Sequence, residues 1–131
     1  MLFTESILSE RHPDSGTRIS VMSRHTLNDG VTPDPRIIPA SYDEHISQMA
    51  PAPKLIGAYY KRGLPWEEFE QMYIDQIRQA DSIPLVQALA YRALRQNLTL
   101  LCIEETPERC HRRLLAQECL IYQPTLTLIH R

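Results

Sequence analysis

Two thiols, an imidazole, acids and arginines crowd into the segment from residue 102 to residue 113, which reads Cys-Ile-Glu-Glu-Thr-Pro-Glu-Arg-Cys-His-Arg-Arg. A deprotonated thiol is a nucleophile, imidazole and carboxylate groups transfer protons, and a guanidinium binds phosphate or carboxylate through forked hydrogen bonds. No other segment of the chain combines these groups so densely. We therefore predict that this segment forms the functional site.

The predicted catalytic residues are Glu104, Cys110 and His111. The predicted anion-binding residues are Arg24, Arg112 and Arg113. Residues 102 and 104 alternate with Ile103, so a strand would carry the carboxylate of Glu104 to its end. A helix that begins soon afterwards attracts anions to its free N–H groups and lowers the pKa of a nearby thiol.

Each of these residues also has a purely structural interpretation. Leu114 lies four positions after Cys110, so the same helical face can carry Cys110 into the core. His111 can simply pair with Glu104, and arginines on a helix often pair with acids or remain solvated. Cys102 and Cys119 are expected to be structural core residues.

Two more specific sites fit the spacing poorly. Six residues separate Cys102 from Arg109, which is longer than a phosphatase-type loop allows, and no glycine lies between them to turn backbone amides toward a phosphate. A zinc site would use Cys102, Glu104, Cys110 and His111. Adjacent helical residues point about 100° apart, and the chain has no Cys-x-x-Cys pair. We therefore expect no bound metal and no cofactor.

Apolar periodicity and turn residues predict the elements around this segment. The expected strands are 2–8, 18–23, 98–103 and 125–129. The expected helices are 41–49, 53–61, one that carries Trp66, Phe69, Tyr73 and Ile77 on a single face, 82–96, and 107–120 with Thr106 as its N-cap and Pro107 at its first position.

This order predicts a single α/β domain over residues 1–131, with a small mixed, mostly parallel sheet flanked by helices. The chain should end in a strand, loop, helix, strand unit whose two strands are parallel. The strand at 98–103 is apolar throughout, as expected of a central strand covered on both faces. Ligands of such sheets bind beyond the carboxyl ends of the strands, where the loop at 104–109 would lie.

Composition narrows the class of protein further. The chain has 131 residues, 43% of them apolar, and a formal net charge of -2, so overall charge does not indicate nucleic-acid binding. No apolar run approaches the roughly 20 residues that span a bilayer, and residues 1–5 lack a basic segment that would begin a secretory signal. We expect a cytoplasmic protein without a membrane partner, whose three cysteines are reduced. Its oligomeric state stays open.

The site segment is similar to a known family signature. Leu-Leu-Cys-Ile-Glu at 100–104, Pro107-Glu108, and Cys-His-Arg-Arg at 110–113 together resemble the family catalogued as domain of unknown function 488. Residues 18–24 resemble that family's second strand and the arginine after it, and Trp66-Glu67-Glu68-Phe69 with Tyr73 resembles its central helix. The resemblance implies a small cytoplasmic α/β domain with its site at 102–113, and it implies no particular reaction.

Two functions from different classes follow. The first is a binding pocket for a small anion, such as a nucleotide or a phosphorylated metabolite, with acid/base or thiol chemistry at Glu104, Cys110 and His111. The second is a non-catalytic binding or interaction module in which the same cysteine, histidine, arginine and glutamate cluster is an internal polar network.

Overall fold

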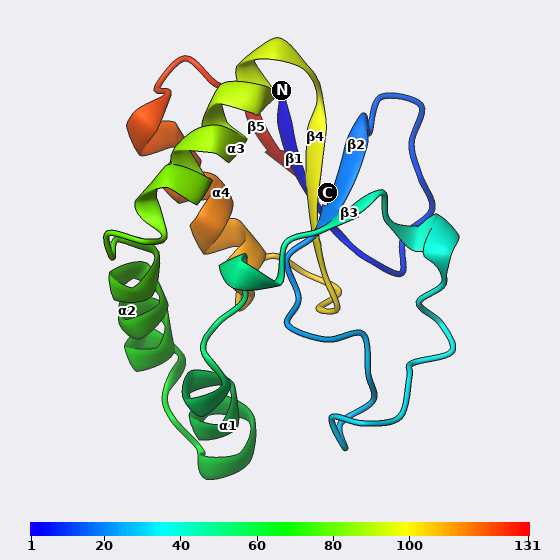
Figure 1. Ribbon diagram of the computed structural model, residues 1–131, viewed down its shortest axis with the longest axis vertical. Helices are drawn as coiled ribbons and strands as arrows, with labels where there is room; N and C mark the ends of the chain where they lie inside the picture. Colours follow the sequence, from blue (N-terminus) through cyan, green and yellow to red (C-terminus); the bar gives the residue numbers. More distant parts are fainter.

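The computed structural model describes residues 1–131 and contains one sheet of five parallel strands in the order β3-β2-β4-β1-β5 (Figure 1). The strands are β1 (Leu2–Ser6), β2 (Thr17–Ser20), β3 (Glu44–His45), β4 (Leu98–Cys102) and β5 (Leu128–His130). The helices are α1 (Pro53–Arg62), α2 (Trp66–Ile77), α3 (Ile83–Arg95) and α4 (His111–Tyr122). The predicted α/β class is confirmed, and the sheet is parallel throughout rather than mixed.

Strand β4 occupies the centre of the sheet, as its continuous apolar sequence predicts. All of its residues are buried, and it pairs with β2 on one side and with β1 on the other. Strand β5 is also parallel to it, but β1 lies between them because β5 pairs with β1. The closing strand, loop, helix, strand unit therefore crosses over one strand.

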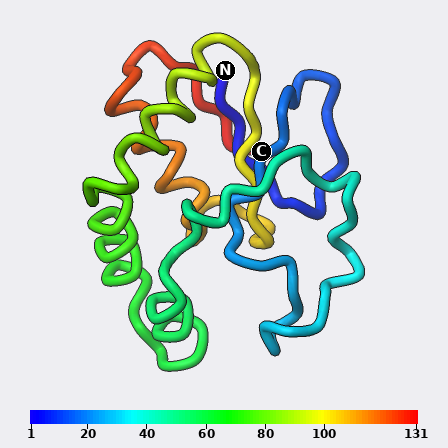
Figure 2. Tube along the Cα trace, viewed as in Figure 1, coloured from blue at the N-terminus to red at the C-terminus, as the bar shows by residue number.

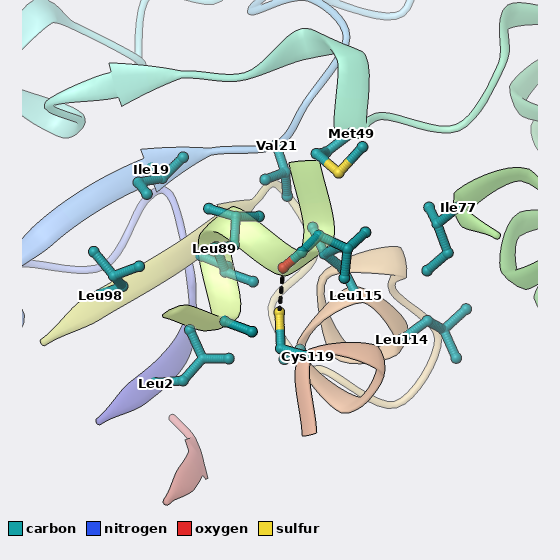
Figure 3. Packing of buried hydrophobic residues seen from close by; sticks show 14 of the residues in the cluster. Leu2, Ile19, Val21, Met49, Ile77, Leu89, Leu98, Leu114, Leu115 and Cys119 are labelled. Atoms are coloured by element: carbon teal, nitrogen blue, oxygen red, sulfur yellow. Dashed lines mark hydrogen bonds between the residues drawn. The ribbon is translucent and has the colours of Figure 1, made fainter. Parts of the chain in front are cut away.

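The helices cover one face of the sheet. Side chains of Leu2, Ile19 and Leu98 pack in one cluster with residues from all four helices (Figure 3). The opposite face is covered by loop and terminal residues: the Thr99 hydroxyl donates to the carbonyl of Ser15 over 2.7 Å, and the Arg131 guanidinium lies 3.9 Å from the centre of the Phe3 ring. In Figures 1 and 2 the loops between β1 and β3 run to the right of the strands and the helices to the left.

The predicted helix at 41–49 is wrong. This segment contains β3, flanked by short 3-10 turns at Pro39–Ser41 and Ser47–Met49. The backbone N–H groups of Asp43 and Ile46 bond to β2 carbonyls, at 2.8 and 2.9 Å, instead of to a helical turn. Sheet pairing with a distant strand has overridden the helical spacing of the apolar residues.

Helix α2 buries the face that its apolar spacing predicts. Phe69, Tyr73 and Ile77 are buried, and the half-buried Trp66 ring stacks on Phe69 with the ring centres 5.1 Å apart. Helix α3 lies within the predicted range 82–96, and its outer face leaves Tyr91 and Leu94 exposed. None of these helices has both the length and the apolar character that crossing a bilayer requires.

Candidate functional site

The predicted site lies where the direction of the chain through the sheet reverses. From β1 the chain passes to β2 on one side, and from β4 it passes to β5 on the other, while β1 and β4 are neighbours. Cys102 ends β4, residues 103–110 form a loop, and α4 begins at His111. Parallel sheets bind ligands at such a point, beyond the carboxyl ends of the strands.

Helix α4 begins later than the sequence signals predict. Its N-cap is Cys110, which has extended backbone angles (φ -138°, ψ 137°), so Thr106 is not the N-cap and Pro107 is not the first helical residue. The Arg113 side chain reaches back and donates to the carbonyl of Pro107 over 3.2 Å and of Glu108 over 2.9 Å. These bonds hold residues 107 and 108 in a loop, and they place Cys110 and His111 at the start of the helix.

His111 joins the helix to two strands. Its Nε2 lies 2.7 Å from the carbonyl oxygen of Val21, just beyond β2, and its Nδ1 lies 3.7 Å from Sγ of Cys102. A carbonyl oxygen only accepts, so Nε2 carries the proton, and in the neutral ring Nδ1 presents a lone pair to Cys102. The Tyr73 ring packs edge-on against the imidazole, with the ring centres 5.4 Å apart, and holds it in place.

Cys102 is the thiol that the surroundings favour as a thiolate. Its sulfur, the sulfur of Cys110 and a ring nitrogen of His111 all lie within 4.8 Å of one another. The pKa of Cys102 is lowered, first by a hydrogen bond from Cys110, against the opposing effect of burial, and further by the N–H groups of Ile103 and Glu104. The same hydrogen bond and burial raise the pKa of Cys110, which therefore keeps its proton.

Arg112 is fully buried beside these sulfurs. Its Nη1 donates to the carbonyl of Glu104 over 2.8 Å and to Sγ of Cys110 over 3.4 Å. Its Nε and Nη2 are buried and have no hydrogen-bond partner. A buried charge normally has its hydrogen bonds satisfied, because leaving them unmade costs several kcal/mol. The free side of this guanidinium is suited to an anion.

The carboxylate of Glu104 points to a different element. The Tyr60 hydroxyl, from α1, donates to Oε1 of Glu104 over 2.7 Å. Desolvation raises the pKa of Tyr60, and the bond to Glu104 raises it further, so the phenol stays protonated. Nothing in the spacing of the sequence singles out Tyr60. Tyr60 is an exposed aromatic residue of α1, a helix that lies far from the site segment in the sequence.

Two of the predicted arginines lie away from the sulfurs. Arg24 donates to the carbonyl of Gly30 over 3.1 Å, within the loop between β2 and β3. Arg113 holds the 107–108 carbonyls and lies 3.8 Å from a carboxylate oxygen of Glu70. The structure therefore brings Cys102, Cys110, His111 and Arg112 together, and leaves Arg24 and the Arg113 guanidinium outside this group.

A cavity of about 410 Å³ opens beside the end of β4. Its lining residues are Met22, Thr26, Leu27, Asn28, Asp29, Asp34, Arg36 and Ile103. Ile103 is the residue of the 103–110 loop that lines it. None of the predicted site residues lines this cavity.

Three of the four ligands considered for zinc are close together, and the fourth is not among them. Cys102, Cys110 and His111 form a buried group, whereas the Glu104 carboxylate is bound by Tyr60. Arg112 donates to Cys110 and adds a positive charge at the same sulfur. The charge of Arg112 also lowers the pKa of Cys102, so it serves as a counter-charge for the thiol that is assigned as the thiolate.

Comparison with known proteins identifies the chain. The family model DUF488-N3a, described as the active DUF488-N3 subclade, matches residues 2–123. No curated protein and no solved structure is a significant match. The match covers nearly the whole sheet, the four helices and the segment from Cys102 to Arg113. The chain therefore belongs to the DUF488 family, the family of domains of unknown function 488.

Proposed function

We propose that this chain binds a small anionic molecule, such as a nucleotide or a phosphorylated metabolite, at the loop 103–110 and the start of α4. The observation that carries the proposal is Arg112, which is fully buried while Nε and Nη2 have no partner. A phosphate or carboxylate oxygen would accept from both nitrogens at once in the forked geometry that arginine favours. Arg113 supports this site by holding the loop carbonyls.

We propose further that Cys102 is the nucleophile of a reaction at this site. Its thiolate form is favoured by Cys110 and the loop N–H groups, and Nδ1 of His111 lies 3.7 Å from its sulfur. Glu104, paired with Tyr60, would act as the acid or base at the outer side of the loop.

The second candidate is a non-catalytic module whose cluster is a structural network. The contacts of His111 with Val21 and of Arg112 with the Glu104 backbone favour it, because both tie α4 and its loop to the sheet. A structural network would leave the stability of the protein unaffected by anions. An anion-binding site requires that a bound anion stabilise the native state.

We propose a cytoplasmic location for the protein. The three cysteines are free thiols, and the proposed chemistry at Cys102 needs a reduced sulfur. Cytosolic reductants maintain that state. Fractionation of the native host would test the location, and recovery of the protein in an oxidising compartment with paired cysteines would contradict it.

The test of anion binding compares Arg112→Gln with Arg109→Gln. Arg109 lies in the same loop and is exposed, so its variant controls for the loss of one positive charge. Titration with inorganic phosphate and with nucleoside monophosphates, followed by thermal shift and calorimetry, should show binding to the parent and to Arg109→Gln. Arg112→Gln should weaken that binding by about 1.5–3 kcal/mol.

Arg112→Lys separates folding from binding, because it keeps the buried charge but loses the fork. It should fold and bind anions more weakly than the parent. Equal affinity of the parent and Arg112→Gln for each anion would contradict the proposal. Failure of every tested anion to stabilise the parent would favour the structural network instead.

A further inference from the structure

We propose that Cys102 and Cys110 are a redox-active dithiol that peroxides convert to an intramolecular disulfide. The two sulfurs lie within 4.8 Å of each other although the residues sit at opposite ends of the 103–110 loop. Both residues are buried, and neither sulfur is already part of a disulfide. This inference goes beyond anion binding, because it needs only the two sulfurs and an oxidant.

The local backbone allows the remaining approach. A disulfide bond is about 2.05 Å long, so the two sulfurs, which lie within 4.8 Å of each other, must approach before it forms. Cys102 is held by β4, between two paired strands. Cys110 is the extended N-cap residue of α4 and ends a loop without regular structure, so it is the cysteine that moves.

The two cysteines have different parts in the chemistry. The Cys102 thiolate attacks one peroxide oxygen, the O–O bond breaks, and Cys102 becomes a sulfenic acid while the peroxide is reduced to an alcohol or to water. The leaving oxygen takes the proton of the Cys110 thiol. The Cys110 thiolate then attacks the sulfur of Cys102, and hydroxide leaves and is protonated by solvent to water. Two thiols are oxidised and one peroxide is reduced.

The environment of the third cysteine, Cys119, makes it unsuited to this reaction. Cys119 is buried in the core, where its thiol lies 3.9 Å from the carbonyl of Val86 (Figure 3). Burial raises its pKa to about 12, so it has almost no thiolate at neutral pH. The chain therefore contains a matched internal control for the reactivity of Cys102.

The experiment treats the full reduced chain with hydrogen peroxide, blocks the remaining thiols with N-ethylmaleimide under denaturing conditions, and digests with trypsin. Cleavage after Arg95, Arg109 and Arg112 places Cys102 in peptide 96–109 and Cys110 in peptide 110–112. We expect one of the three thiols to remain, and the two peptides to be joined by a bond that dithiothreitol breaks.

Variants identify the role of each cysteine. Cys119→Ser should still form the disulfide, while Cys110→Ser should instead accumulate a sulfenic acid on Cys102 that dimedone traps. Cys102→Ser should give neither product. Circular dichroism of each variant confirms that it is folded before treatment. If Cys110→Ser does not fold, the peptide maps of the parent and of Cys119→Ser still test whether the disulfide forms.

Three results would overturn the proposal: three free thiols after treatment, a bond that involves Cys119, or a bond between two chains. The test is also separate from that of anion binding. Arg112→Gln keeps both sulfurs, so it should still form the disulfide even where its affinity for phosphate is lost. A disulfide without anion binding, or anion binding without a disulfide, would contradict only one of the two proposals.

Discussion

His111 Nε2 donates to the carbonyl oxygen of Val21 over 2.7 Å, and this bond links the first residue of α4 to the residue that follows β2. Strand β4 lies beside β2 and ends at Cys102, so the bond also sets the distance from the imidazole to the thiol. Because Nε2 is committed to the carbonyl, Nδ1 is the ring atom that can exchange a proton with Cys102. The thiol site is thus built by two strand ends and one helix.

The pH at which a thiolate forms should distinguish the three cysteines. The pKa of Cys102 is lowered, chiefly by the hydrogen bond from Cys110, whereas the pKa values of Cys110 and Cys119 are raised. Titration by the ultraviolet absorbance of the thiolate should therefore show one thiolate forming below about pH 8.5, the ordinary value for cysteine. Cys102→Ser should remove this transition, and Cys119→Ser should keep it.

The same titration tests the cause of the shift. Cys110→Ala removes the thiol that donates to Cys102, so the midpoint of the remaining transition should rise. An unchanged titration midpoint would mean that the loop N–H groups alone stabilise the Cys102 thiolate. A parent protein with no thiolate below pH 9 would contradict the assignment of Cys102 as the nucleophile.

Phe69 should be a major contributor to stability. It is 3% exposed, and its ring lies between Trp66 at 5.1 Å and Tyr59 at 4.9 Å, measured between ring centres. Phe69→Ala should lower the free energy of unfolding by about 3 kcal/mol or more, because it removes a buried ring and leaves a cavity. Met72→Ala, in the same helix but half exposed, should cost less than about 1 kcal/mol. Urea denaturation measures both, and similar losses would show that the α2 face is misassigned.

Two glycines with positive φ provide a matched pair. An added Cβ at Gly16 would lie 1.9 Å from the carbonyl oxygen of Asn97, while nothing lies within 4 Å of the corresponding position at Gly63. Gly63→Ala should cost about 1–2 kcal/mol from left-handed backbone strain alone. Gly16→Ala should cost roughly 3 kcal/mol or more, because the loop must also move away from the end of α3. Equal losses of stability in the two variants, measured by thermal denaturation, would show that Gly16 does not closely approach the carbonyl of Asn97.

Asp43 should make stability depend on pH in the acid range. Its pKa is lowered chiefly by the hydrogen bonds from Arg11, at 2.8 and 2.9 Å, and then by the N–H of Arg18. A carboxylate whose pKa is lower in the folded state stabilises the protein above its unfolded pKa, near 3.9, and loses this contribution as the pH falls through its folded pKa.

Asp43→Asn should therefore lower the unfolding free energy by about 1 kcal/mol at pH 7, a small figure because both side chains are well exposed. The difference from the parent should disappear between about pH 4 and pH 2. Asp81→Asn, at an exposed position outside any ion pair, should leave the free energy of unfolding at pH 7 close to that of the parent. A difference that persists at pH 2 would assign the effect to packing instead of charge.

Much of the architecture follows from the order of residues. The apolar run of β4 and the single apolar face of α2 each have a local period that matches their final burial. The alternation in β2 does not, because its polar residues Arg18 and Ser20 are buried along with Ile19. The density of thiols, imidazole and guanidinium groups between 102 and 113 likewise marks the site segment, because these groups are neighbours in the sequence.

Other features were decided by contacts between distant residues. Strand β3 exists because β2 offers it hydrogen bonds, and α4 starts at His111 because Arg113 holds the carbonyls before it. Which thiol is charged depends on the contact of Cys102 with Cys110, and the partner of Glu104 is Tyr60 of a separate helix. The local spacing of residues shows which of them lie on the same face of a helix or strand. Only the packed structure decides which groups meet, and desolvation and hydrogen bonding act between groups that meet.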